Sequence, residues 1–248
     1  MSVIITGASS GIGAATAKVF AVHGHDLLLL GRNLERLENT ALACRKIDVN
    51  IRIKILAQDL NALDFKLIEE KLKTISPLSI LINNAGIYEQ ASIQETTAKI
   101  WEDLFQTNLL ASVKLTQFCW DIFLKNKKGS IVNVSSTLGV KPIPKTSAYS
   151  ALKAAMTNWT LSLAQEGGAL NIRANCISPG IIDTPLHPFH NLDETQKKSV
   201  EEQISQIQLL QTLGKPDDVA ESIYFLASEK SKFITGSILH VDGGINIK

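Results

Sequence analysis

Two residues with acid–base chemistry, Tyr149 and Lys153, lie four positions apart in residues 147–155, a segment rich in helix-forming residues. Four positions place both side chains on one face of a helix. A phenol with an ordinary pKa of about 10 is a poor base at neutral pH, and a neighbouring ammonium group would lower that pKa toward the working range. The pair could therefore transfer a proton, although so short a motif needs support from its surroundings.

A hydroxyl group, that of Ser136, precedes Tyr149 by 13 residues. It follows an apolar run at residues 131–134, which predicts a buried strand. A side chain at this point would emerge at the carboxyl end of the strand. There it could hydrogen-bond a substrate oxygen and stabilise the charge that develops on it.

A glycine-rich segment, Thr6 to Gly13, lies between an apolar run at residues 3–6 and a helical pattern that extends to about His23. Glycine lets the main chain turn tightly and approach a pyrophosphate, and the positive end of the following helix favours its negative charge. A purely structural turn is the alternative, but the strand before it and the helix after it favour nucleotide binding. The residues expected to contact the nucleotide are Gly7, Ser9, Ser10, Gly11, Ile12 and Gly13.

Arg32 follows the second apolar run, residues 27–30, where an acidic residue would bind both ribose hydroxyls of NAD. Its guanidinium group could instead pair with a 2′-phosphate, so we expect NADP(H) to be favoured over NAD(H). The alternative is a solvated arginine at the start of a helix that Asn33 caps; Asn33 is also a candidate cofactor contact. Asp59, beyond the third run, could accept a hydrogen bond from the adenine amino group or cap a turn.

Seven apolar runs alternate with longer segments of helical periodicity, and together they predict the fold. Continuous apolar runs are typical of parallel strands that helices cover on both faces. No linker or shift in composition divides the chain, so we expect one doubly wound α/β domain over residues 1–248, with ligands beyond the carboxyl ends of its strands. The runs are residues 3–6, 27–30, 51–56, 80–82, 131–134, 174–177 and 238–241.

The composition argues against several classes of function. The 248 residues carry a net charge of +1, from 25 basic against 24 acidic side chains, so the basic surplus of a nucleic-acid-binding protein is missing. The apolar stretches are far shorter than the roughly 18 residues of a membrane span, and the first residues lack a secretory pattern, so we expect a cytoplasmic protein. Three widely spaced cysteines indicate buried, reduced thiols rather than a disulfide framework.

Residues 185–210 fit the alternating pattern less well. They begin with prolines and two histidines, His187 and His190, and continue as a polar helical segment. We expect a lid that covers the substrate, because a long insertion in a compact domain is often functional; a plain surface excursion is the alternative. Two histidines without further clustered ligands predict no metal site.

Together these motifs resemble those of the short-chain dehydrogenase/reductase family, from Thr6 to Gly244. The resemblance implies a three-layer α/β/α Rossmann-type fold with a seven-stranded parallel sheet, a nicotinamide cofactor and a catalytic tetrad. The matching segments are the glycine loop, Asn83-Asn84-Ala85-Gly86, Asn108, Ser136, Tyr149, Lys153, Pro179-Gly180 and Val241-Asp242-Gly243-Gly244.

The resemblance also implies a role for each residue of the tetrad, Asn108, Ser136, Tyr149 and Lys153. Tyr149 would be the general acid or base, with its pKa lowered by Lys153 and by the positive charge of the nicotinamide ring. Ser136 would hold the same substrate oxygen. Lys153 would also bind the ribose next to the nicotinamide, and Asn108 would position a water molecule that relays protons to it. Further cofactor contacts would come from Leu60, Asn84, Ala85, Gly86, Pro179, Gly180, Ile182 and Thr184, the last two at the carboxamide.

The substrate is less well defined. The pattern is similar to that of 3-oxoacyl-(acyl-carrier-protein) reductases, which implies interconversion of a ketone and a secondary alcohol, with an acyl thioester as one option. Leu170 departs from it, since those enzymes often carry an arginine there that docks the acidic carrier; Lys127 and Lys128 could supply such contacts or form a solvated helix end. Alternatives are an NAD-dependent dehydrogenase of a sugar alcohol or hydroxysteroid-like substrate, and a nucleotide-binding sensor or scaffold.

Trp120 and Trp159 lie in the two long helical segments that family members commonly use to form dimers and tetramers. The resemblance therefore implies a homodimer or homotetramer, with the tetramer expected and residues 233–247 in a second interface. Core packing is the other reading of both tryptophans.

Overall fold

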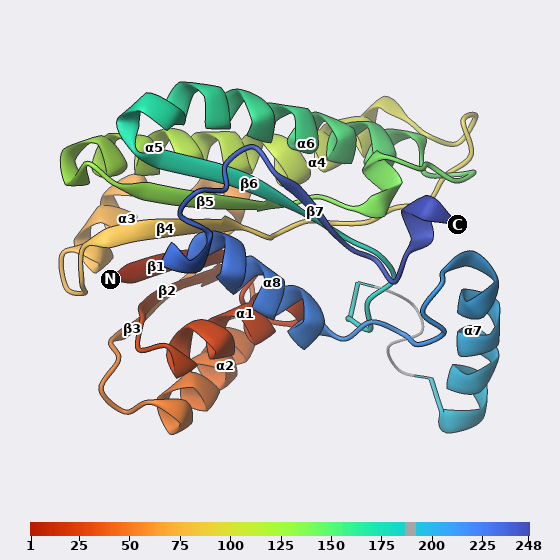
Figure 1. The fold of residues 1–248 in the computed structure, drawn as a ribbon, viewed down its shortest axis with the longest axis horizontal. Coiled ribbons are helices and arrows are strands. Elements are labelled where there is room, and N and C mark those ends of the chain that lie inside the picture. The colour runs from red at the N-terminus through yellow and green to blue at the C-terminus, as the bar shows by residue number, and fades with distance from the viewer. Residues whose placement is uncertain (187–191) are drawn as a thin grey trace.

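A seven-stranded parallel sheet forms the centre of the computed structural model, which describes residues 1–186 and 192–248 (Figure 1). Helices cover both faces, so the predicted three-layer α/β/α fold is confirmed. The strand order is β3-β2-β1-β4-β5-β6-β7, and the winding therefore reverses between β1 and β4. A reversal of this kind leaves a crevice at the carboxyl ends of the two strands. His187 and His190 lie outside the described residues.

The strands lie where the apolar runs predict them and differ only at their ends. The third begins at Ile53 rather than at residue 51, and the sixth continues to Pro179. All neighbouring pairs are parallel, and most strand residues are buried, as expected for a sheet covered on both faces. The bounds are β1 Ser2–Thr6, β2 Asp26–Gly31, β3 Ile53–Ala57, β4 Leu78–Asn83, β5 Gly129–Val134, β6 Ile172–Pro179 and β7 Ile238–Val241.

Two sets of helices bury the two faces of the sheet. The first set, α1, α2 and α8, packs around Phe20 and Ile223, and the second, α3, α5 and α6, packs around Leu81 and Phe123. One helix, α7, lies apart from both layers, beyond the carboxyl ends of the strands (Figure 1). The bounds are α1 Gly11–Val22, α2 Leu34–Ile47, α3 Phe65–Leu72, α4 Ala98–Phe105, α5 Ala111–Asn126, α6 Ser147–Gly167, α7 Glu194–Ile207 and α8 Pro216–Ala227.

Local sequence determines where several of these helices begin. The side chain of Asn33 accepts a hydrogen bond from the main-chain N–H of Arg36 at 2.9 Å and caps α2. Asp193 and Gln196 form a reciprocal capping box at the start of α7. Pro216 occupies the first turn of α8, where its missing N–H costs no hydrogen bond.

The hydroxyl group of Thr6 joins β1 to β4 at the point where the winding reverses. It donates to the carbonyl of Ile82 at 3.2 Å and accepts from the main-chain N–H groups of Asn84 at 2.9 Å and Ala85 at 3.0 Å. The side-chain amide of Asn84 donates in return to the carbonyl of Thr6 at 2.9 Å. These bonds fix the segment after β4 against the glycine loop that follows β1.

The three cysteines are free and buried, which confirms the prediction of reduced thiols. Burial raises the pKa of the Cys44 thiol to about 11, so this thiol stays protonated at neutral pH. Within the described part of the chain, no helix is both long and apolar enough to cross a membrane.

Replacement of Thr6 by valine should lower the free energy of unfolding by about 1 to 3 kcal/mol, because it removes the partner of two partly buried N–H groups and of a buried carbonyl. Urea unfolding measures this change. Thr6→Ser, which keeps the hydroxyl group, is the matched control and should lose less than half as much. Equal losses in the two variants would show that the methyl group, and not the hydrogen bonds, provides the stability.

Candidate active site

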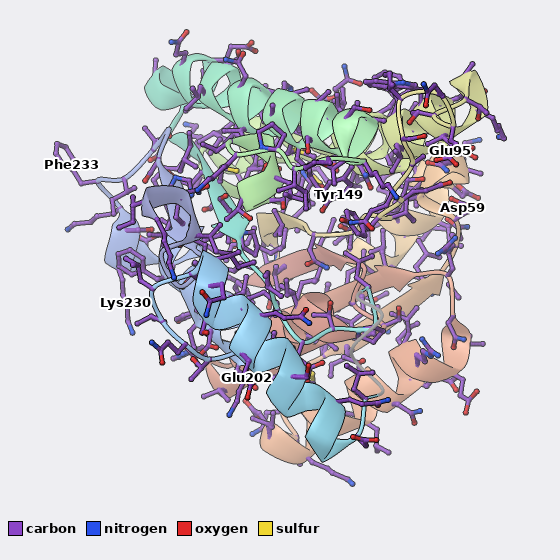
Figure 2. All side chains as sticks on the ribbon, turned by 90° about the vertical axis from the view of Figure 1, so that its right-hand side faces the viewer. Asp59, Glu95, Tyr149, Glu202, Lys230 and Phe233 are labelled. Carbon is purple, nitrogen blue, oxygen red and sulfur yellow. The ribbon has the colours of Figure 1, made fainter. Side chains whose placement is uncertain are left out.

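A cavity of about 1080 Å³ opens at the carboxyl edge of the sheet. Figure 2 views this edge, with Tyr149 near the middle and Asp59 toward one side. Segments that follow all seven strands contribute to its lining, as the position of the crevice requires. The predicted site residues among its lining are Gly7, Ser9, Ser10, Ile12, Arg32, Asn33, Asp59, Leu60, Asn84, Ala85, Gly86, Ser136, Tyr149, Lys153, Pro179, Gly180, Ile182 and Thr184.

Gly11 and Gly13 were predicted to contact the nucleotide. They are not among the lining residues, but they determine the conformation of the loop. A Cβ atom on Gly13 would lie 2.2 Å from the carbonyl oxygen of Gly7, a distance that no side chain tolerates. Gly11 has a φ of 52°, in the left-handed region that favours glycine. Ser10 caps α1 without a side-chain hydrogen bond to the described first turn, so the N–H groups of that turn can bind an anion.

Tyr149 lies in α6 and is 6% exposed. Burial raises the pKa of its phenol above the ordinary value, although a hydrogen bond with the side chain of Ser136 acts in the opposite direction. The ring of Tyr88 packs edge-on against it, with ring centroids 4.8 Å apart. The tyrosine and the serine that the sequence paired are thus in contact, and the phenol is neutral at physiological pH.

Lys153 lies one turn further along α6 and is 4% exposed. Its ammonium group donates a hydrogen bond to the carbonyl of Val134 at 2.9 Å and lies 5.6 Å from the centroid of the Tyr149 ring. Burial lowers the pKa of Lys153 to about 8. The expected lowering of the pKa of Tyr149 is not present in the chain by itself, because burial raises this pKa more than the hydrogen bond with Ser136 lowers it. That expectation also included the positive charge of a nicotinamide ring.

Asn108 is fully buried in the π-helical turn Gln106–Leu110 between α4 and α5. Its side chain accepts from the main-chain N–H of Ile87 at 2.7 Å and donates to the carbonyl of the same residue at 2.9 Å. A Cβ atom placed on Gly86 would lie 3.0 Å from Oδ1 of Asn108 and 3.6 Å from Nζ of Lys153. Asn108 therefore lies behind the cavity lining, next to Lys153, and fixes the turn after β4. Single π-turns of this kind are frequent at functional sites.

At Asn33 and at Asp59, the capping role and the cofactor contact do not exclude each other. Asn33 caps α2 and also lines the cavity. Asp59 accepts the N–H of Asn61 at 2.9 Å, which caps a short 3-10 helix, and its carboxylate also lines the cavity. Both residues have a structural role at a position where a ligand could also reach them.

Arg36 is the clearest residue that the sequence analysis missed. It lines the cavity from the first turn of α2, four residues after Arg32, and both arginines are exposed. Its place in the first turn of the helix that follows β2 could have revealed it, since that turn starts at the carboxyl edge of the sheet. Lys141, Gln206, Ile207 and Lys248 also line the cavity and come from loops, from α7 and from the chain end, where no motif marks them.

Of the expected lid, residues 185–210, the structure describes Pro185, Leu186 and residues 192–210. Pro185, Leu186 and the last turn of α7, through Gln206 and Ile207, line the cavity. Ile204, in the same helix, is 3% exposed. The end of α7 therefore borders the cavity, and the function of residues 185–210 as a lid stays a prediction.

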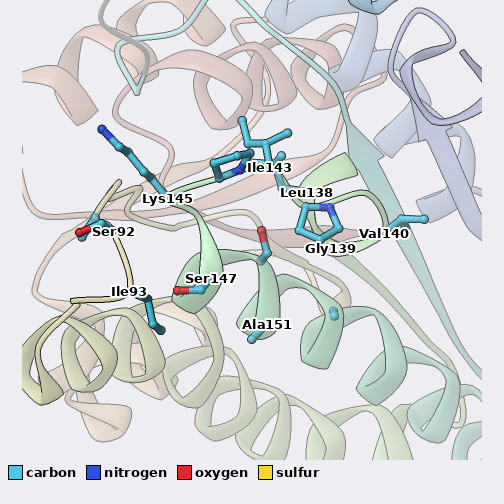
Figure 3. A pocket seen from close by; sticks show the side chains of 14 residues that line it. Ser92, Ile93, Leu138, Gly139, Val140, Ile143, Lys145, Ser147 and Ala151 are labelled. Atoms are coloured by element: carbon cyan, nitrogen blue, oxygen red, sulfur yellow. The ribbon is translucent and has the colours of Figure 1, made fainter. Parts of the chain in front are cut away.

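A second cavity, of about 810 Å³, lies against the first turns of α6 (Figure 3). The N-terminal part of α6, with Ser147 and Ala151, forms one wall, and Ile93, Ile143 and Lys145 come from the loops above it. Its lining includes neither Tyr149 nor Lys153 among the described residues.

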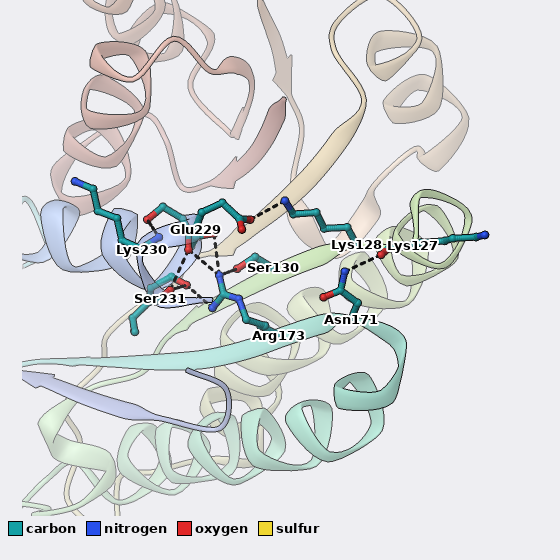
Figure 4. Close-up of polar contacts among 11 residues, drawn as sticks. Lys127, Lys128, Ser130, Asn171, Arg173, Glu229, Lys230 and Ser231 are labelled. Carbon is teal, nitrogen blue, oxygen red and sulfur yellow. Dashed lines mark hydrogen bonds and ion pairs between the residues drawn. The ribbon is translucent and has the colours of Figure 1, made fainter. Parts of the chain in front are cut away.

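Lys127 and Lys128, the candidate contacts for an acidic carrier, lie at the amino end of β5, on the edge of the sheet opposite to Tyr149. Lys128 forms an ion pair with Glu229 at 2.6 Å (Figure 4). Beside it, Arg173 binds the last carbonyls of α8, which stabilises the end of that helix. Lys128 therefore already has an acidic partner within the chain.

Comparison with protein families identifies the chain. A family model described as enoyl-(acyl carrier protein) reductase matches residues 7–246. The chain belongs to this family, within the short-chain dehydrogenases/reductases, and is an oxidoreductase of alcohol and ketone groups.

Individual relatives have several substrates. The 3-oxoacyl-(acyl-carrier-protein) reductase of Thermotoga maritima is 32% identical over 244 residues, 98% of this chain and 97% of that protein. The 7alpha-hydroxysteroid dehydrogenase of Bacteroides fragilis is 32% identical over 249 residues, 99% of this chain and 94% of the relative. The structure of L-sorbose reductase from Gluconobacter frateurii, complexed with NADPH and L-sorbose, is similar with a TM-score of 0.90 and 27% identity, over 99% of this chain and 96% of the other.

The raised pKa of Tyr149 predicts that this phenol stays neutral in alkaline solution when the chain is free of cofactor. A spectrophotometric titration of tyrosinate up to a pH of about 10.5 should give the same curve for the protein and for Tyr149→Phe, since Tyr149 contributes no phenolate in that range. If the protein formed one more tyrosinate per chain than the variant below a pH of about 10, burial would not be the dominant effect.

Proposed function

We propose that the protein is an NADP(H)-dependent oxidoreductase that reduces a ketone to a secondary alcohol, with Tyr149 as the proton donor. The observation that carries the proposal is the convergence of Tyr149, Ser136 and Lys153 in the cavity lining, with Nζ of Lys153 5.6 Å from the centroid of the Tyr149 ring. A bound nicotinamide cofactor would supply the hydride. The chain's own groups then have to hold the carbonyl oxygen and deliver a proton to it.

The pKa of Tyr149 favours the direction of reduction. Burial raises this pKa, so the phenol carries its proton at neutral pH and can donate it to the oxygen as negative charge develops there. Ser136 would donate a hydrogen bond to the same oxygen and stabilise that charge. Oxidation of an alcohol requires the phenolate instead, which burial disfavours.

Lys153 and Asn108 support the proton donor in this proposal. The ammonium group of Lys153, fixed by the carbonyl of Val134, adds positive charge where the phenolate forms and would bind the cofactor ribose. Asn108 acts as a positioning residue, because both ends of its side-chain amide hold Ile87. Its expected role in a water relay to Lys153 remains a prediction.

The residues present fit an NADP(H) cofactor. The glycine loop and the start of α1 can bind the pyrophosphate, since Gly13 packs so closely on Gly7 that the main chain itself forms the surface there. Arg32 and Arg36 would bind the 2′-phosphate, and Asp59 and Leu60 would contact the adenine. Residues 84–86 would lie along the ribose, and Pro179, Gly180, Ile182 and Thr184 would contact the nicotinamide carboxamide.

We propose small carbonyl compounds as the substrates. We also propose that the chain is a single domain in which residues 185–210 act as a lid over the substrate. An acyl thioester is one candidate, as the name of the Thermotoga maritima relative suggests. Oxidation of a cyclic alcohol is a second candidate, because the Bacteroides fragilis relative is a hydroxysteroid dehydrogenase. We also propose a cytoplasmic homodimer or homotetramer, formed through α5 and α6, whose Trp120 and Trp159 are only partly buried in this chain.

Tyr149→Phe should lower kcat for ketone reduction by about 10² to 10⁴-fold, because the proton donor is lost. Binding of NADPH, followed by fluorescence, should change little. Tyr224→Phe removes a phenol from α8, away from the cavity lining, and is the matched control that should retain activity. Full turnover in Tyr149→Phe would mean that another group donates the proton.

The preference for NADPH over NADH, as the ratio of the two kcat/KM values, should fall by about 10- to 100-fold in Arg32→Ser and by a similar factor in Arg36→Ser. Each variant loses a charge-assisted contact with the 2′-phosphate. Arg45→Ser, in the last turn of α2, is the control and should leave the ratio unchanged. An unchanged ratio in Arg32→Ser and Arg36→Ser would place the phosphate elsewhere.

A further inference from the structure

The charge of the large cavity differs from that of the whole chain. The side chains of the whole sequence carry a net charge of +1, yet the charged side chains among the described lining are five cations and a single carboxylate. They are Arg32, Arg36, Lys141, Lys153, Lys248 and Asp59. A cavity of this kind attracts anions.

The cations come from different parts of the cavity lining. Arg32 and Arg36 follow β2, at one end of the cavity, and Lys153 lies near the middle. Lys141 follows β5, and Lys248 follows β7. Because β1 and β4 lie between β2 and β5, the ends of those two strands are about 14 Å apart at roughly 4.8 Å per strand. A dinucleotide with its phosphates on the arginines and the glycine loop therefore leaves Lys141 and Lys248 for another ligand.

Main-chain carbonyls hold both lysine side chains without neutralising them. The ammonium group of Lys141 donates to the carbonyl of Ile245 at 3.4 Å. That of Lys248 donates to the carbonyls of Ser205 at 2.6 Å and Gln208 at 3.2 Å. Neither lysine belongs to any ion pair found among the described residues. The nearby carboxylate of Asp242 accepts from two N–H groups of its own loop.

Apolar side chains also line the cavity that contains these lysines and Tyr149. Leu138, Pro142 and Ile143 come from the loop after β5, and Ile207 and Ile245 come from α7 and the chain end. A ligand that reaches from Tyr149 to the lysines would have an apolar body and a charged far end, because apolar walls bind one and ammonium groups the other.

We propose that Lys141 and Lys248 bind an anionic group, a carboxylate or a phosphate, of a substrate whose ketone reacts at Tyr149. The proposal rests on the proposed reductase function and specifies its substrate class: ketones with an apolar segment between the carbonyl and an anion. Each lysine is exposed, so its contribution to binding is modest and depends on ionic strength.

The direct test compares straight-chain methyl ketones that end in a carboxylate, over a range of chain lengths, with the methyl esters of the same acids. With NADPH and at low salt, the protein should prefer the acid at the length that spans the apolar segment. Lys141→Met and Lys248→Met should each lower the acid-to-ester ratio of kcat/KM by about two- to fivefold, mainly through KM, and the double variant should lower it further.

Lys145→Met is the matched control. Lys145 lies in the same loop as Lys141 but lines the second cavity (Figure 3). Its replacement should leave the acid-to-ester ratio unchanged. The proposal is overturned if the protein reduces acids and esters equally well at every length, or if Lys145→Met lowers the ratio as much as Lys141→Met does.

A second comparison distinguishes the two sources of the anion. Acetoacetyl-coenzyme A and the acetoacetyl thioester of N-acetylcysteamine share the reacting group, and only the first carries phosphates. A loss of preference for the coenzyme A thioester in Lys141→Met identifies a phosphate ligand. A loss confined to the oxo acids identifies a carboxylate ligand.

A calorimetric comparison of octanoate and octanamide binding tests the anion site without any turnover. Octanoate should bind more tightly than octanamide, and the double lysine variant should remove the difference. If no ketone is reduced while this difference is present, the proposed reductase function fails and the anion site stands. If ketones are reduced but octanoate and octanamide bind equally, the anion site fails and the reductase stands.

Discussion

The hydrogen bonds of the Thr6 hydroxyl group fix the part of the fold on which the site depends. One oxygen atom joins the carbonyl of Ile82 to the N–H groups of Asn84 and Ala85, at the point where the winding of the sheet reverses. The glycine loop leaves on one side of this point, and the turn after β4 leaves on the other. Because both segments would otherwise diverge, this contact sets the distance between the nucleotide loop and the rest of the cavity.

The same constraint extends from the glycine loop to Tyr149 through buried contacts. The turn after β4 brings Gly86 against Asn108 and Lys153, and Asn108 in turn binds the main chain of Ile87. Lys153 shares α6 with Tyr149. Asn108 and Lys153, which support the proton donor in the proposal, are thus held by main-chain groups. Preorganisation of this kind avoids rearrangement during a reaction.

Burial has a chemical effect as well as a structural one. It raises the pKa of Tyr149 and lowers that of Lys153 to about 8, so that the neutral form of each group is favoured relative to its state in water. The phenol is then a proton donor at neutral pH, and Lys153 still carries its charge below about pH 8. The sequence analysis expected the opposite direction for Tyr149, because it considered the charges of Lys153 and of a bound nicotinamide ring and not the burial of the phenol.

Much of the fold was predictable from the sequence, because continuous apolar runs and helical periodicity report directly on burial. The cavity positions of Arg32, Ser136 and Tyr149 were also predictable, since each follows a strand or belongs to a motif. The roles of Thr6 and Lys248 were not, because they depend on contacts between residues far apart in the chain. The ion pair of Lys128 with Glu229, which engages a candidate carrier contact, is of the same kind.

A crystal structure of the protein with NADP⁺ would test the central claim, that the reversal point of the sheet holds a dinucleotide beside Tyr149. The expected result is a 2′-phosphate in contact with Arg32 and Arg36, a pyrophosphate on the glycine loop, and the nicotinamide ring next to Tyr149 and Ser136. A nucleotide bound elsewhere, or one with its adenosine end at Tyr149, would contradict this.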